Sequence, residues 1–103
     1  MENEYKEEEY IMNTKINELM LEFYNCINEN KKMSVHMIFH NTNTIIRNTM
    51  IPIEIEINNK GIYVTSNDDF QIFIRNEINN IKYDEYDNSY CLIIDDLEMY
   101  LDF

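Results

Sequence analysis

The chain has 103 residues, of which 45% are hydrophobic, and this is enough for one domain with a buried core. Its formal net charge of −12 argues against binding to nucleic acid or to an anionic membrane, because both need a positive footprint. No segment approaches the roughly 18 consecutive apolar residues of a membrane span, and the N-terminus lacks the regions of a signal peptide. We therefore expect a single domain, residues 1–103, in the cytoplasm.

A long first helix is predicted from about Glu4 to Asn30. Lys31 and Lys32 follow it, where cations suit the negative end of the helix dipole. Apolar residues recur at spacings of three and four, which places them on one helical face. These residues are Met12, Ile16, Leu19, Met20, Phe23 and Ile27.

Strand patterns replace the helical period after this segment. Val35, Met37 and Phe39 alternate with polar residues and predict a strand, with a short helix as the alternative, whereas residues 41–50 are ambiguous. Residues 51–57 are the clearest strand, with isoleucine at every odd position and glutamate on the opposite face. Residues 58–61 predict a turn that puts Gly61 where a positive φ is needed. Residues 62–65 are expected to return as the partner strand.

A second, shorter helix is predicted after this hairpin. Ser66 and Asp69 have the spacing of a capping box, and five apolar residues after them would share a helical face. These five residues are Phe70, Phe73, Ile74, Ile78 and Ile81. The alternative is a strand over residues 70–74, and the helix is favoured because its pattern covers more residues.

The rest of the chain predicts further strands. Residues 81–86 and 89–94 form a strand pair around Asp87 and Asn88, and the tail over residues 97–103 alternates cleanly. The expected class is α+β, in which a long N-terminal helix packs on a small antiparallel sheet, together with the second short helix.

The acidic residues gather at the two ends of the chain. Residues 31–75 hold four acids and five bases, whereas residues 76–103 hold eight acids against Lys82 alone. Such crowding costs stability through repulsion, and interspersed bases would give the same solubility, so the pattern indicates recognition of a basic partner. The alternative is a solvated acidic face with structural tyrosines. The predicted partner-binding residues are Asp84, Glu85, Tyr86, Asp87, Asp95, Asp96 and Glu98.

A short, acidic chain rich in asparagine and isoleucine resembles the small inhibitors that phages and mobile elements encode against host defence. These include anti-CRISPR and anti-restriction DNA mimics. The resemblance covers composition and length, and it carries over no motif and no functional residue. It implies a stoichiometric inhibitor in the host cytoplasm that occludes a basic nucleic-acid-binding protein, such as a CRISPR–Cas effector or a restriction component. The alternative is a non-catalytic module whose amphipathic helix pairs with a partner helix or, in a homodimer, with a second copy.

Catalysis, a cofactor and a bound metal are not expected. His36 and His40 are four residues apart, and Cys26 and Cys91 could complete four metal ligands, but the chain has no CxxC or HExxH motif. The two cysteines are instead expected as free thiols, because two are too few for a disulfide framework. The acidic runs could hold Mg²⁺, but no lysine or histidine base is spaced beside them. With one glycine, the chain has no glycine-rich phosphate loop.

Overall fold

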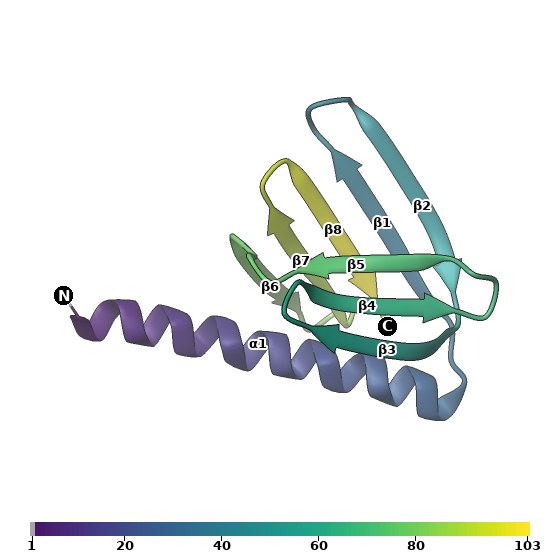
Figure 1. Cartoon of the computed structure of the whole chain (residues 1–103), viewed down its shortest axis with the longest axis horizontal. Coiled ribbons are helices and arrows are strands. Elements are labelled where there is room, and N and C mark those ends of the chain that lie inside the picture. The colour runs from purple at the N-terminus through teal and green to yellow at the C-terminus, as the bar shows by residue number, and fades with distance from the viewer. Residues whose placement is uncertain (1) are drawn as a thin grey trace.

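The computed structural model describes the backbone of residues 2–103 and the side chains of residues 13–103. Within this part, one helix precedes eight strands that pair antiparallel in two sheets (Figure 1). The sheets have the strand orders β2-β1-β8-β7-β6 and β3-β4-β5. The elements are α1 (Glu2–Glu29), β1 (Met33–Phe39), β2 (Thr44–Met50), β3 (Pro52–Asn58), β4 (Gly61–Ser66), β5 (Gln71–Arg75), β6 (Asn80–Asp84), β7 (Ser89–Ile94) and β8 (Leu97–Asp102).

The predicted first helix is confirmed as α1. Leu19, Met20 and Phe23 of its predicted apolar face are buried, as is Cys26, and Met12 lies outside the described side chains. The helix contacts β3 and β6, which are edge strands of the two different sheets. It therefore covers the gap between the sheets, and its N-terminal end extends beyond them (Figure 1).

The core lies between α1 and the inner faces of the two sheets. In each strand of the five-stranded sheet that crosses the core, alternate residues point inward, as the pleat requires. Burying one large aliphatic or aromatic side chain stabilises the fold by about 1.5–3 kcal/mol. The face of each strand that carries such side chains therefore turns inward. The buried residues of the central strands are Met33, Val35, Met37, Tyr90, Leu92, Ile94, Met99 and Leu101, and they meet Val64, Ile72 and Ile74 of the smaller sheet.

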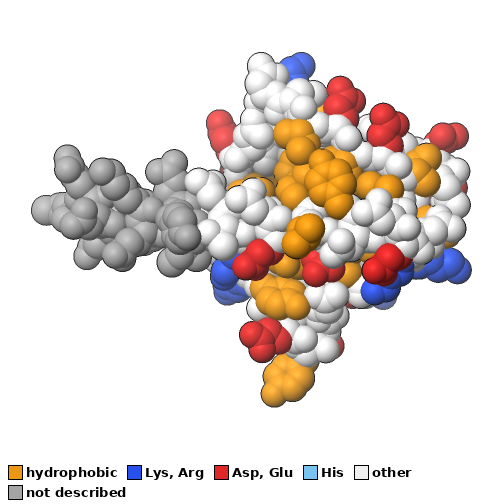
Figure 2. Space-filling model, turned by 90° about the horizontal axis from the view of Figure 1, so that it is seen from below, with side chains coloured by type: hydrophobic (Ala, Val, Ile, Leu, Met, Phe, Trp, Pro, Cys, Tyr) orange, Lys and Arg blue, Asp and Glu red, His pale blue; other side chains and the backbone are white. Residues whose placement is uncertain are grey.

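The strand predicted over residues 51–57 is confirmed as β3, and it pairs with β4 through the expected turn. Gly61 has a φ of +154°, so the positive φ predicted for it is also confirmed. The isoleucine face is less buried than alternation suggests, since Ile53 and Ile57 are 52% and 58% exposed. The register shifts between Pro52 and Glu54, which turns this edge strand away from a simple inward face. Figure 2 shows hydrophobic side chains gathered on this side of the molecule.

The predicted second helix is wrong, and the alternative strand is correct. Gln71–Arg75 is β5, and Ile72 and Ile74 are buried because they pair with the inward-facing residues of β4. The residues taken for a capping box form a turn instead. Ser66 Oγ donates to Asp68 Oδ1, the Phe70 N–H donates to the same oxygen, and Asp69 takes a positive φ of 69°.

The other predicted strands are confirmed, and the ambiguous residues 41–50 contain β2. β6 and β7 pair as a hairpin, and the tail forms β8, which lies between β1 and β7 in the centre of the five-stranded sheet. The class is α+β as expected, but the expectation of a small sheet is wrong, because eight strands form two sheets and hold more residues than the single helix described. Within the described residues, no helix is both long enough and apolar enough to cross a membrane.

Candidate functional site

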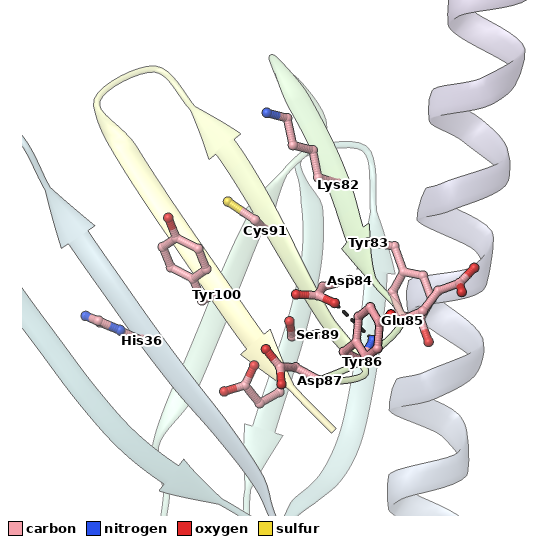
Figure 3. A pocket seen from close by; sticks show the side chains of 11 residues that line it. His36, Lys82, Tyr83, Asp84, Glu85, Tyr86, Asp87, Ser89, Cys91 and Tyr100 are labelled. Carbon is pink, nitrogen blue, oxygen red and sulfur yellow. Dashed lines mark hydrogen bonds between the residues drawn. The ribbon is translucent and has the colours of Figure 1, made fainter.

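The outer face of the five-stranded sheet carries the residues that alternate with the core. One row of opposed residues crosses all five strands, and four of its members point onto the same open face in Figure 3. From one edge of the sheet to the other, this row is Arg47, His36, Tyr100, Cys91 and Lys82. A second row lies beside it and places Asp102, Ser89 and Asp84 on β8, β7 and β6.

A hollow of about 730 Å³ opens over these rows at the β6–β7 end of the face. Four carboxylates from three segments line it, together with the aromatic rings of Tyr86 and Tyr100. The carboxylates are those of Asp84, Glu85, Asp87 and Asp102. Because adjacent strands lie about 4.8 Å apart, Asp102 joins this group through strand pairing although it is distant from it in the sequence.

The turn between β6 and β7 is held by its own polar residues. Asp84 Oδ1 accepts a hydrogen bond from the Tyr86 N–H at 2.9 Å, which is the local bond that makes aspartate a turn residue. The Tyr83 hydroxyl donates to Asn88 Oδ1 at 2.8 Å, and Asn88 takes a φ of 49°, a region that asparagine tolerates. This turn leaves the Tyr86 side chain 99% exposed.

The second acidic group lies at the other end of β7, in the turn to β8. Asp95 Oδ2 lies 2.9 Å from Arg75 Nη1 of β5, and Asp96 accepts a hydrogen bond from Asn41 Nδ2. These two acids therefore join the β7–β8 turn to the smaller sheet and to the β1–β2 loop. The charge of Asp95 is matched within the molecule by Arg75, whereas Asp96 has the neutral amide of Asn41 as its partner.

Glu98 has two partners on the outer face. The Tyr100 hydroxyl donates to Glu98 Oε2 at 2.7 Å, and His40 Nε2 lies 2.6 Å from Oε1. The hydrogen bond from Tyr100, with that from His40, lowers the pKa of the Glu98 carboxyl below its ordinary value. The same bond to Glu98, with a further one to Cys91, raises the pKa of the Tyr100 hydroxyl.

The seven predicted binding residues thus form two groups and not one surface. The six residues of β7 separate the groups by roughly 20 Å, at about 3.3 Å per residue. Asp84, Glu85, Tyr86 and Asp87 form the first group, which we call the β6–β7 tip. Among the described side chains, neither Glu85 nor Asp87 has an ion-pair or hydrogen-bond partner, and Asp84 accepts only the Tyr86 N–H of its own turn. In the second group Asp95 pairs with Arg75, Glu98 binds His40 and Tyr100, and Asp96 accepts a hydrogen bond from the neutral Asn41 amide.

Asp102 and His36 lie on this face but were not among the predicted partner-binding residues. Asp102 shares the alternation of Glu98 and Tyr100, so the pattern of the tail contained the signal. The four-ligand metal alternative fails, because Cys26 lies in the core and Cys91 lies on the outer face. Within side chains 13–103, no three His, Cys, Asp or Glu residues are grouped as metal ligands.

Comparisons with known proteins identify no similar protein. No protein-family model, curated protein or solved structure matches the chain. The fold class is a strand-rich α+β architecture.

Proposed function

We propose that the chain is a non-catalytic inhibitor that binds a basic nucleic-acid-binding protein, such as a CRISPR–Cas effector or a restriction component. Its carboxylates take the positions that phosphates occupy in the partner's normal ligand. The observation that carries this proposal is the β6–β7 tip, where unmatched carboxylates surround an open hollow beside a fully exposed tyrosine.

The geometry of the acids supports a phosphate-like role. Successive phosphates along one DNA strand are about 3.4 Å apart along the axis, so the roughly 20 Å between the two acidic groups corresponds to about six base pairs. A groove that follows a nucleic-acid backbone would therefore meet negative charge at both ends of β7. Tyr86 and Tyr100 add amphipathic ring surface between and beside these charges, of the kind that anchors protein interfaces.

The two acidic groups differ in their partners within the molecule, and this difference predicts that they contribute unequally to binding. Carboxylates without a partner lose no internal interaction when they meet a guanidinium or ammonium group of another protein. Asp95, Asp96 and Glu98 must share or exchange their present partners. We therefore assign the main contact to the β6–β7 tip and a supporting contact to the second group.

Among the side chains described for α1, which begin at residue 13, the alternative module that pairs through the amphipathic helix has less exposed apolar surface available to it. Leu19, Met20 and Phe23 of that face already belong to the core of this chain. Leu21 and Tyr24 remain exposed on α1, at 60% and 47%. The acidic face is therefore the better-supported binding surface.

The test is capture of a partner on the immobilised chain from cells of its native host, followed by competition. A matched chain carries Asp84→Asn, Glu85→Gln, Asp87→Asn, Asp95→Asn, Asp96→Asn and Glu98→Gln. We expect the parent to capture a protein that the neutralised chain does not, and we expect nucleic acid bound by that protein to displace the parent. Equal capture by both chains, or simultaneous binding of chain and nucleic acid, would contradict the proposal.

A further inference from the structure

A second hollow, of about 470 Å³, opens between the two sheets at the free edge of β5. β5 is the edge of the smaller sheet opposite to β3, the strand that α1 contacts, and β1 and β2 extend past it (Figure 1). Apolar side chains from both sheets line this inter-sheet hollow. They are Met37, Phe39, Ile72, Ile94, Leu97 and Met99.

The inter-sheet hollow gives a ligand direct access to the core. Ile72, Ile94 and Met99 line it although they are buried members of the core cluster. Its volume lies within the roughly 300–1,000 Å³ of small-molecule sites, which are mostly apolar and carry a few polar groups at fixed positions. The lining therefore suits the apolar part of a small ligand.

The charged groups of the inter-sheet hollow favour a cation as the polar part of that ligand. Among the described side chains, one cation, Arg75, and two acids, Asp95 and Asp96, line it. Arg75 is already held, since its Nη1 lies 2.9 Å from Asp95 Oδ2 and its Nη2 lies 3.5 Å from Glu77 Oε2. An anionic ligand would have to break these pairs. Asp96 has the neutral Asn41 amide as its side-chain partner, so its charge is left to meet a cation.

Two aromatic rings favour the same sign of charge. Phe39 and Phe73 line the inter-sheet hollow, and Phe73 is 39% exposed. The face of an aromatic ring is negative because of its quadrupole, and it attracts an ammonium group. A cation at Asp96 is therefore favoured by the acid and by the rings that share the hollow with it.

We propose that the inter-sheet hollow is a binding site for a small amphipathic cation. The apolar chain of this ligand lies on the core residues, and its ammonium group lies at Asp96. The site does not rest on the proposed function, whose main contact is the β6–β7 tip at the other end of β7, and it is measured on the chain alone. Failure of one inference therefore leaves the other standing.

The probe is decylammonium, and decanoate is its control because it carries a similar apolar chain with the opposite charge. Calorimetric titration of the full chain, below the concentration at which either probe forms micelles, should give a Kd of about 0.1–1 mM for decylammonium. Decanoate should bind at least about tenfold more weakly, because like charges oppose it. Octylammonium should bind about fifteenfold more weakly than decylammonium, since each buried CH₂ group tightens binding about fourfold.

Methionine methyl groups report where the probe binds. Met37 and Met99 line the inter-sheet hollow, whereas Met33 and Met50 pair with each other at the other end of the β1–β2 hairpin. In NMR spectra of chain with labelled methionine methyls, decylammonium should shift the first two resonances and leave the second two unchanged. It should also raise the thermal unfolding midpoint, because a ligand of the folded state stabilises it, whereas a detergent effect would lower the midpoint.

Two variants that each remove one negative charge test the role of Asp96. Asp96→Asn should weaken decylammonium binding about fivefold, the upper range for one exposed ion pair, and leave decanoate no weaker than before. Glu29→Gln, at an exposed residue of α1, should leave decylammonium binding unchanged. Equal binding of decylammonium and decanoate, equal weakening by the two variants, resonance shifts that spare Met37 and Met99, or no binding in this range would each overturn the proposal.

Discussion

The Tyr100 hydroxyl donates a hydrogen bond of 2.7 Å to Glu98 Oε2, two residues away on the same outer face of β8. His40 binds the other carboxylate oxygen from the end of the β1–β2 hairpin, so Glu98 ties the loop to the centre of the sheet. These bonds favour the charged form of Glu98 and lower its pKa from the ordinary value of 4.5. The folded state therefore holds this proton less tightly than the unfolded state does.

Glu98→Gln should remove part of the acid sensitivity of the fold. Because the folded pKa lies below the unfolded value, the contribution of Glu98 is present above pH 4.5 and is lost as the pH falls through the folded pKa. Urea unfolding midpoints of parent and variant, followed from neutral to acidic pH, should therefore converge at the acidic end. Glu85→Gln, at an exposed turn residue, is the control and should leave the acid dependence unchanged. An unchanged acid profile in Glu98→Gln would contradict this assignment.

Tyr90→Phe should protect the fold at alkaline pH. Burial of the Tyr90 ring, and then the negative charges of Glu18 and Glu22, raise its pKa from 10.0 to about 12. A raised folded pKa means that stability is lost as the pH rises through this window, since the unfolded state releases the proton first. Thermal midpoints measured across the window should fall less in Tyr90→Phe than in the parent. Tyr86→Phe, at a ring that is 99% exposed, should follow the parent.

Phe23→Ala should destabilise the protein by about 3–5 kcal/mol, the usual cost of removing a buried aromatic ring. The Phe23 side chain is 0% exposed, and its ring meets Phe103 edge to face with centroids 5.3 Å apart. Leu21→Ala, at a neighbouring helical residue that is 60% exposed, should change the free energy of unfolding by no more than about 0.5 kcal/mol. Chemical denaturation of the two variants measures both values. Similar losses in both would mean that α1 does not pack through the face described.

Gly61→Ala should cost more than about 1 kcal/mol, because a side chain strains a backbone at this positive φ. A Cβ atom there would also collide with the Ile74 carbonyl oxygen of β5 and lie 2.8 Å from Phe73 Cε2. Since the first of these is backbone, the strain cannot be relieved by a side-chain rotation alone. Asn59→Ala, in the adjacent turn, is the control for the denaturation measurement. Equal stability of Gly61→Ala and the parent would show that the β4–β5 approach is looser than described.

Local patterns predicted the elements of this fold better than their assembly. Helix α1 and the hairpins β3–β4 and β6–β7 were predictable, because each depends on neighbouring residues and on turn chemistry. Residues 70–81 were not, because Ile72 and Ile74 fit a strand while Phe70, Ile74 and Ile78 fit a helix. Pairing with β4 decides between the two, and a residue-by-residue pattern does not contain that contact.

The acidic site was predictable in composition but not in layout. Asp84, Glu85 and Asp87 stand out in the sequence, and the strand pair predicted around Asp87 and Asn88 placed them at or near its turn. The separation from Asp95 and Asp96 depends on the length of β7. The addition of Asp102 depends on β8 pairing next to β7, and the pairing of Asp95 with Arg75 depends on how the two sheets meet. These are long-range relationships that a single sequence does not encode in its spacing.

Two variants of equal charge test most directly whether the β6–β7 tip recognises a basic partner. One carries Asp84→Asn, Glu85→Gln and Asp87→Asn, and the other carries Asp95→Asn, Asp96→Asn and Glu98→Gln. Both variants remove three negative charges. An effect of net charge alone would therefore weaken binding to the captured partner equally in the two variants. We predict that the first variant loses at least about tenfold more affinity than the second, and that the parent's affinity falls steeply between about 50 mM and 500 mM salt. Equal losses in the two variants, or binding that is indifferent to salt, would contradict the account.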